Sequence, residues 1–194
     1  MNHLILGLIG PMYAGTTTVA KWLHDQHGAI VFRHSDILRS TLEAFKIPLV
    51  RKNYSDLVQH LVARHGEDIL YRGIAEAVSR FIVDSSLADR RAIVVLDSIR
   101  IPGELELWHE RPDFESLCID APFEARLDRA RKMNRFAGDC TMSARDFRLL
   151  HKIWSERQGA KSCLEADAVI TNDSSVEDLV EKVRGRLLAL GREL

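Results

Sequence analysis

Short apolar runs alternate with longer amphipathic segments along most of the chain. The runs are bounded by polar or turn residues, which predicts strands at residues 4–9, 29–33, 91–97, 114–120 and 168–171. The segments between them carry apolar residues three and four positions apart, which is typical of helices that cover a sheet. This alternation predicts an α/β fold of three layers, αβα, with a five-stranded parallel sheet.

Two helical regions are expected to stand out from the sheet and its covering layers. No strand signal occurs from about Thr41 to Asp84, and residues of about 37–84 are expected to form an inserted helical region. Such helices either close over a substrate or cover the sheet. A basic helix over Phe123 to Met133 leads into a glycine-containing loop and a helix expected over 144–158, so a lid is predicted at about residues 130–145.

Length and composition favour a single domain over residues 1–194, with 46% hydrophobic and 28% charged positions. The formal net charge of −1 predicts neither a nucleic-acid partner nor a membrane partner. Cys118, Cys140 and Cys163 lack metal or redox spacing and are expected to be reduced in a cytoplasmic protein. The first apolar run is expected to be a strand and not a signal peptide. Monomer and homodimer both remain open.

The loop after the first predicted strand carries the most specific motif. Residues 10–18 match the phosphate-binding pattern G-x-x-x-x-G-K-[ST] at every fixed position except one. Amides of such a loop and of the helix that follows converge on an anion. The residues expected to bind a nucleotide are therefore Gly10, Ala14, Gly15, Thr16, Thr17 and Thr18.

Thr16 stands where this motif has its lysine. By analogy with the loss of one preorganised donor, the missing ammonium costs about 3–4 kcal/mol of transition-state stabilisation. A weak kinase, a compensated kinase and a nucleotide-binding protein without turnover all remain open, as does a βα turn without a ligand. Lys21 lies four residues after Thr17, so its backbone starts about 6 Å farther along the helix axis than that of Thr17. A lid arginine is therefore the better substitute.

Acidic and basic residues follow the other predicted strands. Asp97 ends an aliphatic run and, with Thr17, is expected to hold Mg²⁺. Arg100 either grips a substrate phosphate or pairs on the surface with Glu104 or Glu106. Further candidates near strand ends or in the lid are Asp36, Arg39, Asn172, Arg131 and Arg135, with Asn172 either lining an adenine pocket or capping the last helix.

With these motifs the chain resembles the P-loop kinases of small molecules, and the resemblance extends over nearly its whole length. Within them it resembles the nucleoside monophosphate kinase group, including adenylate, cytidylate and dephospho-coenzyme A kinases. The resemblance implies ATP and Mg²⁺ at Gly15, Thr16 and Thr17, and an acceptor at Asp36, Arg39 and Arg100. It also implies that Arg131 and Arg135 close on the transferring phosphate from the lid.

Two functions are therefore expected as alternatives. In the first, the chain transfers a phosphoryl group from ATP to a small phosphorylated acceptor, a nucleoside monophosphate or similar nucleotide, with Asp36 or Asp97 orienting the acceptor oxygen and Arg131 and Arg135 bearing charge. In the second, it is a nucleotide-binding regulatory protein with weak or no turnover. Thr16 is the feature that keeps the second alternative open.

Overall fold

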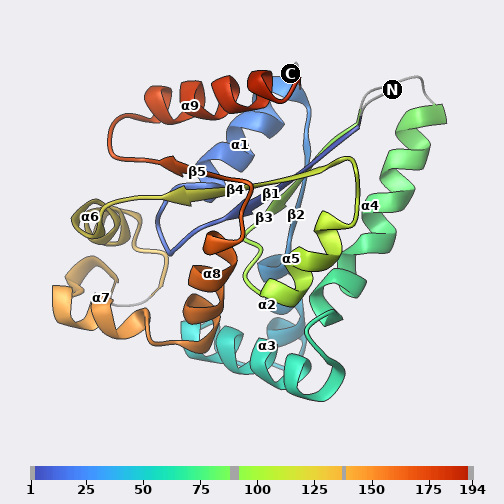
Figure 1. The fold of residues 1–194 in the computed structure, drawn as a ribbon. Helices are drawn as coiled ribbons and strands as arrows, with labels where there is room; N and C mark the ends of the chain where they lie inside the picture. Colours follow the sequence, from blue (N-terminus) through green and yellow to red (C-terminus); the bar gives the residue numbers. More distant parts are fainter. Residues whose placement is uncertain (1–2, 88–91, 137–138, 192–194) are drawn as a thin grey trace.

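The sheet is parallel throughout, as the sequence predicts. The computed structural model describes residues 3–87, 92–136 and 139–191. Within them the strand order is β2-β3-β1-β4-β5, and every neighbouring pair is parallel (Figure 1). The carboxyl ends of all strands therefore lie at one edge. The strands are β1 (Leu4–Ile9), β2 (Ile30–Arg33), β3 (Ile93–Asp97), β4 (Phe114–Asp120) and β5 (Ala168–Thr171).

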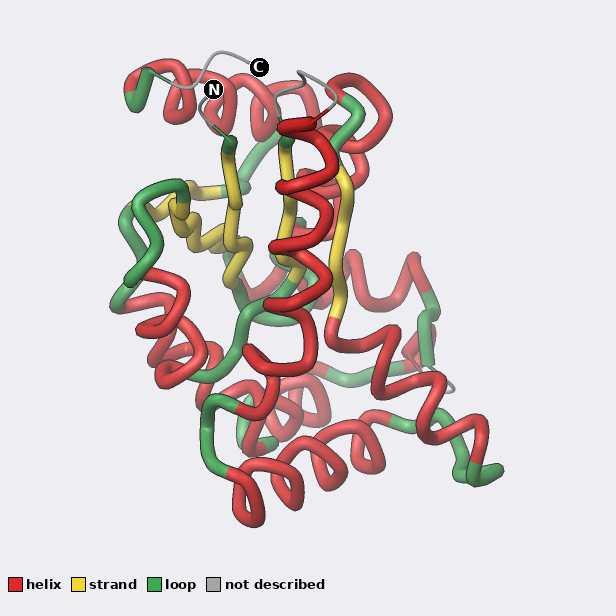
Figure 2. The backbone as a smooth tube through the Cα atoms, turned by 90° about the vertical axis from the view of Figure 1, so that its right-hand side faces the viewer, coloured by secondary structure: helices red, strands yellow, loops and turns green. Residues whose placement is uncertain are grey.

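Helices cover both faces of this sheet, which makes the predicted three layers. Helices α1 and α9 lie on one face, and α4, α5 and α8 lie on the other (Figure 1). Figure 2, turned so that α4 faces the viewer, shows this helix running alongside the strands. The helices are α1 (Thr16–His27), α2 (His34–Ala44), α3 (Arg51–His65), α4 (Ile69–Leu87), α5 (Pro102–His109), α6 (Phe123–Met133), α7 (Ala144–Leu150), α8 (Trp154–Leu164) and α9 (Val176–Ala189).

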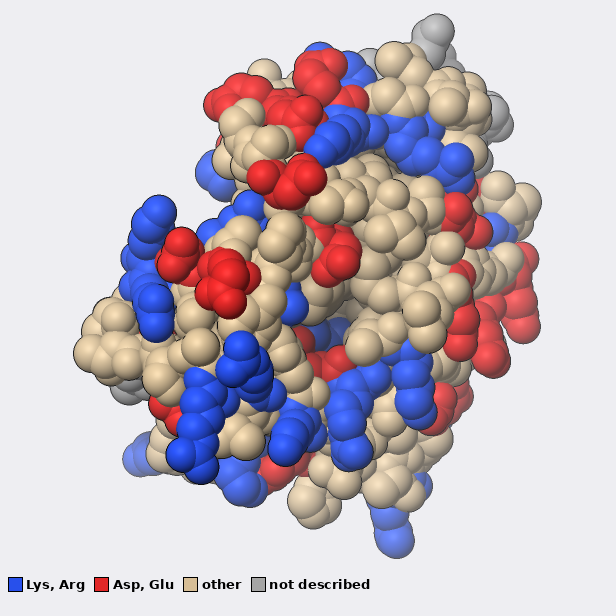
Figure 3. Space-filling view, turned by 60° about the vertical axis from the view of Figure 1, so that its left-hand side comes forward, with Lys and Arg blue, Asp and Glu red and all other residues tan. Residues whose placement is uncertain are grey.

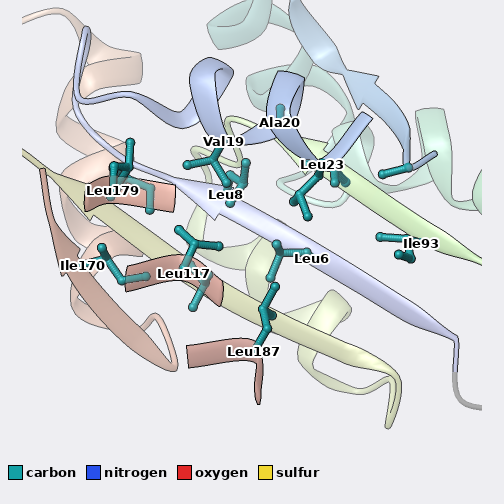
Figure 4. Close-up of a cluster of buried hydrophobic side chains, with 14 of the residues drawn as sticks. Leu6, Leu8, Val19, Ala20, Leu23, Ile93, Leu117, Ile170, Leu179 and Leu187 are labelled. Atoms are coloured by element: carbon teal, nitrogen blue, oxygen red, sulfur yellow. The ribbon is translucent and has the colours of Figure 1, made fainter. Parts of the chain in front are cut away.

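The central strand β1 is buried on both faces, which explains its uninterrupted apolar run. Leu6 and Leu8 belong to the core cluster shared with α1 and α9 (Figure 4). Ile5 and Ile9 point to the opposite face and pack in the cluster shared with α4 and α5. All four side chains are fully buried. Strands of a covered parallel sheet read as continuous hydrophobic runs for this reason.

One expected helix is divided in the structure, and two others begin with different kinds of cap. The single helix expected over 144–158 is two helices, because turn bonds from Lys152 N to Leu149 O and from Ile153 N to Leu150 O interrupt it. The break gives α8 a direction of its own, so that it packs against the sheet. At α2 no polar cap is used, because β2 runs directly into the helix. At α9 the cap is Ser175, whose hydroxyl accepts a hydrogen bond from Asp178 N.

The expectation of three reduced cysteines is wrong for two of them. Cys118 of β4 and Cys163 of α8 form a disulfide, with their Cα atoms 5.2 Å apart. Cys140 is free and exposed. The pair is separated by 45 positions in the sequence. Only the packing of α8 onto the sheet brings the two thiols together, so their spacing carries no signal.

No helix among residues 3–87, 92–136 and 139–191 combines the length and the apolar character that a membrane span requires. The predicted lid, at about residues 130–145, includes residues 137–138, which lie outside the described residues. Its described part consists of the end of α6, the 3₁₀ turn Asp139–Thr141 and the start of α7. The inserted helical region contains α3, most of α4 and most of α2.

The disulfide predicts a difference between two cysteine substitutions. Cys163→Ser is expected to lower the free energy of unfolding by about 2–4 kcal/mol, because a crosslink across a long loop restricts the unfolded chain. Urea unfolding of the oxidised protein measures this loss. Cys140→Ser is the control and is expected to leave stability within about 0.5 kcal/mol of the wild type. Equal stability of both variants and the wild type without reductant would show that the bond does not form.

Candidate functional site

A cavity of about 720 Å³ opens at the carboxyl edge of the sheet. Figure 3 shows a face of the molecule that is hollowed near its centre, with basic and acidic side chains close together around the hollow. The residues that line the cavity come from the glycine loop, the ends of β2 and β3 and the segment after β5. Others come from helices α2, α3, α6 and α8. The chemically important ones are Thr16, Thr17, Thr18, Arg33, Asp36, Arg51, Asp97, Arg100, Arg129, Arg135, Glu156 and Asn172.

The loop between β1 and α1 is built so closely that its two motif glycines have no room for a side chain. A Cβ atom at Gly10 would lie 2.4 Å from the carbonyl oxygen of Ile119. A Cβ atom at Gly15, where φ is +120°, would lie 2.5 Å from Asn172 Nδ2. Helix α1 begins directly afterwards at Thr16. In its first turn the amides of Thr18 and Val19 donate to the carbonyl of Gly15 at 3.0 and 3.1 Å. The positive end of the helix dipole gives this side of the cavity a partial positive charge.

Asp97 is the centre of a polar cluster at the end of β3. Its Oδ2 accepts hydrogen bonds from Thr17 Oγ1 at 3.1 Å and from Arg33 Nε at 2.8 Å. Its Oδ1 accepts one from Ser98 Oγ at 3.1 Å. Thr16 Oγ1 lies 3.4 Å from the same Ser98 hydroxyl. The residue is only 4% exposed, so its charge depends on these partners.

Arg100 pairs with Glu156, a residue that no local sequence signal marks. Its guanidinium donates to Glu156 Oε1 in the first turn of α8, and neither Glu104 nor Glu106 is its partner. The other oxygen, Glu156 Oε2, accepts a hydrogen bond from the backbone N–H of Met12 at 3.1 Å. A carboxylate therefore bonds directly to an amide of the glycine loop. It joins the loop to an arginine at the end of β3.

A second ion pair holds the outer side of the loop. Arg51 of α3 donates to Asp139 Oδ2 at 2.8 Å, and Tyr13 Oη donates to the same oxygen at 2.6 Å. Burial raises the pKa of Asp139, but hydrogen bonds from Tyr13, Arg51 and the amide of Phe136 outweigh it, so that the pKa lies below its usual range. Burial and Asp139 raise the pKa of Tyr13. The left-handed backbone of Tyr13, with φ of 63°, is held by this network.

The side of the loop near β5 is held by Asn172 and Arg129. Asn172 is buried, and its Nδ2 donates to the carbonyl of Ala14 at 2.7 Å. Arg129 Nη1 donates to the carbonyls of Tyr13 and Ala14, and its Nη2 donates to Asn172 Oδ1 at 3.2 Å. Asn172 therefore lines the cavity and does not cap α9.

A buried acid lies behind the start of α2. Glu104 is fully buried, and its Oε1 is 3.1 Å from Nε2 of His34, a residue that lines the cavity. Trp108 Nε1 also donates to Glu104 Oε1, at 3.3 Å. Burial raises the pKa of Glu104, and the hydrogen bond from Trp108 and the imidazole of His34 only partly oppose that rise.

The structure brings most of the predicted site residues to the cavity. Those that line it are Gly15, Thr16, Thr17, Thr18, Asp36, Asp97, Arg100, Arg135 and Asn172. Gly10 and Ala14 are buried in the wall of the loop. Arg39 is exposed and Arg131 donates to the carbonyl of Met142 at 2.9 Å, and neither is among the described residues that line the cavity. The guanidinium of Arg135 stands 5.6 Å from the centre of the Phe136 ring.

Four charged residues of the cavity were not selected from the sequence: Arg33, Arg51, Arg129 and Glu156. Arg33 ends a predicted strand, so the rule used for Asp97 also applies to it. Arg129 lies in the basic helix, where its neighbours have the same residue type and spacing. Arg51 and Glu156 sit on helices whose faces the sequence does not orient, and no local signal marks them.

Comparisons with known proteins support the fold and leave the activity open. No family model matches the chain. It is 25% identical to a UPF0200/UPF0201 protein of Archaeoglobus fulgidus, over 98% of this chain and 57% of that protein, so the chain spans little more than half of that relative. It is also 26% identical to a UPF0200 protein of Methanoculleus marisnigri, over 96% of this chain and 97% of that protein.

Among solved structures, shikimate kinase from Bacteroides thetaiotaomicron has a TM-score of 0.59 at 13% identity, covering 95% of this chain and 98% of that one. Shikimate kinase from Aquifex aeolicus has a TM-score of 0.51 at 14% identity, covering 97% and 98%. An uncharacterized protein from Eubacterium ventriosum has a TM-score of 0.59 at 10% identity, covering 96% and 99%. The chain therefore shares the fold of these solved structures, two of which are shikimate kinases, while the nucleoside monophosphate kinase group is not singled out.

The Arg51–Asp139 pair predicts a pH-dependent loss of stability. The pKa of Asp139 is lowered in the folded state, so its stabilisation is present above its ordinary pKa of 3.8 and disappears as the pH falls through the folded value. Asp139→Asn is expected to lower the free energy of unfolding by about 2 kcal/mol at neutral pH. The difference from the wild type should shrink below pH of about 4.

Urea unfolding at neutral pH and below pH of about 4 checks this prediction. Asp25→Asn removes the exposed pair of Asp25 with Lys21 and is the control, with an expected change within about 0.5 kcal/mol. A loss at Asp139 that is equally large in acid and at neutral pH would contradict the role of its charge.

Proposed function

We propose that this chain transfers a phosphoryl group from ATP to a small phosphorylated acceptor, a nucleoside monophosphate or a similar nucleotide. One observation carries the proposal. The glycine loop, the acid at the end of β3 and several arginines meet in one cavity of about 720 Å³. Phosphoryl transfer needs little covalent chemistry from a protein, and it depends on positioning and on positive charge around the phosphates. The kinase-like fold supports the same reaction class.

The donor phosphates would lie against the loop and the start of α1. Backbone N–H groups of a glycine loop and of the start of a helix converge on an anion. Thr17 Oγ1 and Asp97 Oδ2, 3.1 Å apart, are a hydroxyl and a carboxylate of the kind that Mg²⁺ prefers, and they would hold the ion. When bound, Mg²⁺ would offset charge on the phosphate oxygens.

The acceptor would lie on the other side of the cavity, near α2 and α8. Asp36, in the first turn of α2, is exposed and lines the cavity, so its carboxylate is available to orient an acceptor oxygen. Asp97 is less available, because Arg33, Thr17 and Ser98 already occupy its oxygens. Arg100 would bind the acceptor phosphate after exchanging its partner Glu156 for that phosphate. Arg135 would contribute charge from the segment after α6.

A nucleotide-binding regulatory protein with weak or no turnover is the second candidate. Two observations favour it. Thr16 provides no ammonium at the loop, and the carboxylate of Glu156 hydrogen-bonds to the loop amide of Met12. A negative charge at this place opposes the approach of a phosphate chain.

ADP production from Mg-ATP distinguishes the two candidates. The wild type is expected to form ADP only when one of the nucleoside monophosphates, deoxynucleoside monophosphates or dephospho-coenzyme A is present. Asp97→Ala and Arg100→Ala should lower kcat/KM by about 10²–10³, because each removes a preorganised group that faces the phosphates. Lys21→Ala is the control, because Lys21 is exposed and pairs with Asp25.

Each outcome decides between the functions. Undiminished turnover in both alanine variants would contradict the assigned site. Activity only after Thr16→Lys would favour the nucleotide-binding protein. Inactivity of both the wild type and Thr16→Lys with every acceptor would contradict the proposed reaction or acceptor class.

A substitution of Glu156 is expected to strengthen nucleotide binding, whereas the substitutions of Asp97 and Arg100 are expected to weaken activity. Glu156→Gln is expected to bind ADP about 10-fold more tightly than the wild type, because a negative charge is removed beside the loop and Arg100 is freed. Isothermal titration calorimetry measures the affinity. Glu165→Gln makes the same change at the exposed far end of α8 and should leave the affinity unaltered. Weaker binding by Glu156→Gln would mean that this carboxylate supports the bound state.

A further inference from the structure

We propose that Arg33 supplies the positive charge beside the phosphate loop that a lysine at position 16 would otherwise supply. Its ligand is the phosphate chain of a nucleoside diphosphate or triphosphate. The inference deepens the proposed function and rests on it. It concerns binding of the phosphates, which can be measured without turnover.

The topology of the sheet places Arg33 at this site. Strands β2 and β3 are parallel neighbours, and their register pairs Arg33 with Asp97. Both residues are the last of their strands, so both lie at the carboxyl edge, where the cavity opens. The ion pair from Arg33 Nε to Asp97 Oδ2 is 2.8 Å long. This pair orients the guanidinium and also compensates the buried charge of Asp97.

A short chain of polar contacts connects position 16 to Arg33. Thr16 Oγ1 is 3.4 Å from Ser98 Oγ, and Ser98 Oγ donates to Asp97 Oδ1 at 3.1 Å. The second oxygen of Asp97 bonds to Arg33. The side chain at position 16 is thus connected, through the hydroxyl of Ser98, to the carboxylate that binds the guanidinium. A lysine at position 16 would bring a second cation to Asp97, so Thr16 and Arg33 are compatible with each other.

The terminal nitrogens of Arg33 are available to bind a ligand. Within the described part of the chain, its hydrogen bond and its ion pair both run through Nε to Asp97, which leaves Nη1 and Nη2 for a ligand. The side chain is 30% exposed, whereas that of Asp97 is 2% exposed. Two terminal nitrogens of a guanidinium match the spacing of phosphate oxygens and bind them in a bidentate manner.

The other cations of the site are bound differently. Arg135, the lid arginine that lines the cavity, lies over the Phe136 ring, 5.6 Å from its centre. Lys21 pairs with Asp25 at 2.6 Å, its side chain is 73% exposed, and it is not among the described residues that line the cavity. Arg51 pairs with the buried Asp139 and Arg100 pairs with Glu156. Both nitrogens at the tip of Arg129 donate to backbone or amide oxygens of the loop and Asn172.

The test is the affinity for ADP, measured by isothermal titration calorimetry in the presence of EDTA, so that no metal ion contributes charge. Arg33→Ala is expected to weaken ADP binding by about 10- to 100-fold, since a charge-assisted pair of hydrogen bonds is lost. Thr16→Lys combined with Arg33→Ala is expected to restore the affinity to within about 3-fold of the wild type, because the ammonium returns to the motif position. Lys21→Ala removes the same charge from α1 and should bind like the wild type.

A second pair of changes guards against loss of folding. Arg33→Gln combined with Asp97→Asn removes both charges of the buried pair, so that neither is left uncompensated. Addition of Thr16→Lys to this folded background should strengthen ADP binding by about 10-fold or more. Thermal unfolding of each variant confirms that the affinities belong to folded protein.

The outcomes separate this inference from the proposed function. ADP binding by folded Arg33→Ala at the wild-type affinity would overturn the role of Arg33 and would leave phosphotransfer untouched. Failure of Thr16→Lys to rescue binding in either background would also overturn it. A wild type that binds ADP through Arg33 but forms no product with any acceptor would refute the proposed reaction alone. A wild type that binds no ADP either in EDTA or with Mg²⁺ would refute both.

Discussion

The site depends on one buried carboxylate. Asp97 ends the strand beside the central β1, is only 4% exposed, and has to be compensated where it lies. Thr17 and Ser98 donate hydroxyl hydrogen bonds to it, and Arg33 donates a charged one. These partners come from the first turn of α1, from the residue after β3 and from the end of β2. Asp97 therefore couples the loop geometry to the register of the neighbouring strand.

A second set of contacts positions α8. The disulfide of Cys163 with Cys118 attaches one end of this helix to β4, and Glu156 attaches the other end to the loop amide of Met12. Glu156 also neutralises Arg100. A bound phosphate chain and this carboxylate compete for the same positive groups, so the described arrangement fits a site whose affinity depends on where the start of α8 lies. The two proposed functions differ in how easily a phosphate chain displaces Glu156 from Arg100 and the Met12 amide.

Local sequence patterns were sufficient for the elements and for the loop. Five aliphatic runs predicted the five strands of the described sheet, and the glycine spacing located the turn between β1 and α1. They were insufficient where an element's direction depends on packing. The expected helix over 144–158 is divided at residues 151–153, and this break sets the direction in which α8 carries Glu156. Arg39 and Arg131 have suitable residue types, but they lie outside the cavity because their places on α2 and α6 face elsewhere.

The sequence by itself determined the parallel α/β fold, the glycine loop and its unusual Thr16, and the acid that follows β3. These features follow from periodicity and spacing within short segments, where covalent geometry limits the choices. Only the tertiary structure decided which charges meet. Arg33 and Asp97 are 64 positions apart, and Met12 and Glu156 are 144 positions apart. Their pairing results from strand order and helix packing. No local pattern predicts it, because these residues meet only in the folded chain.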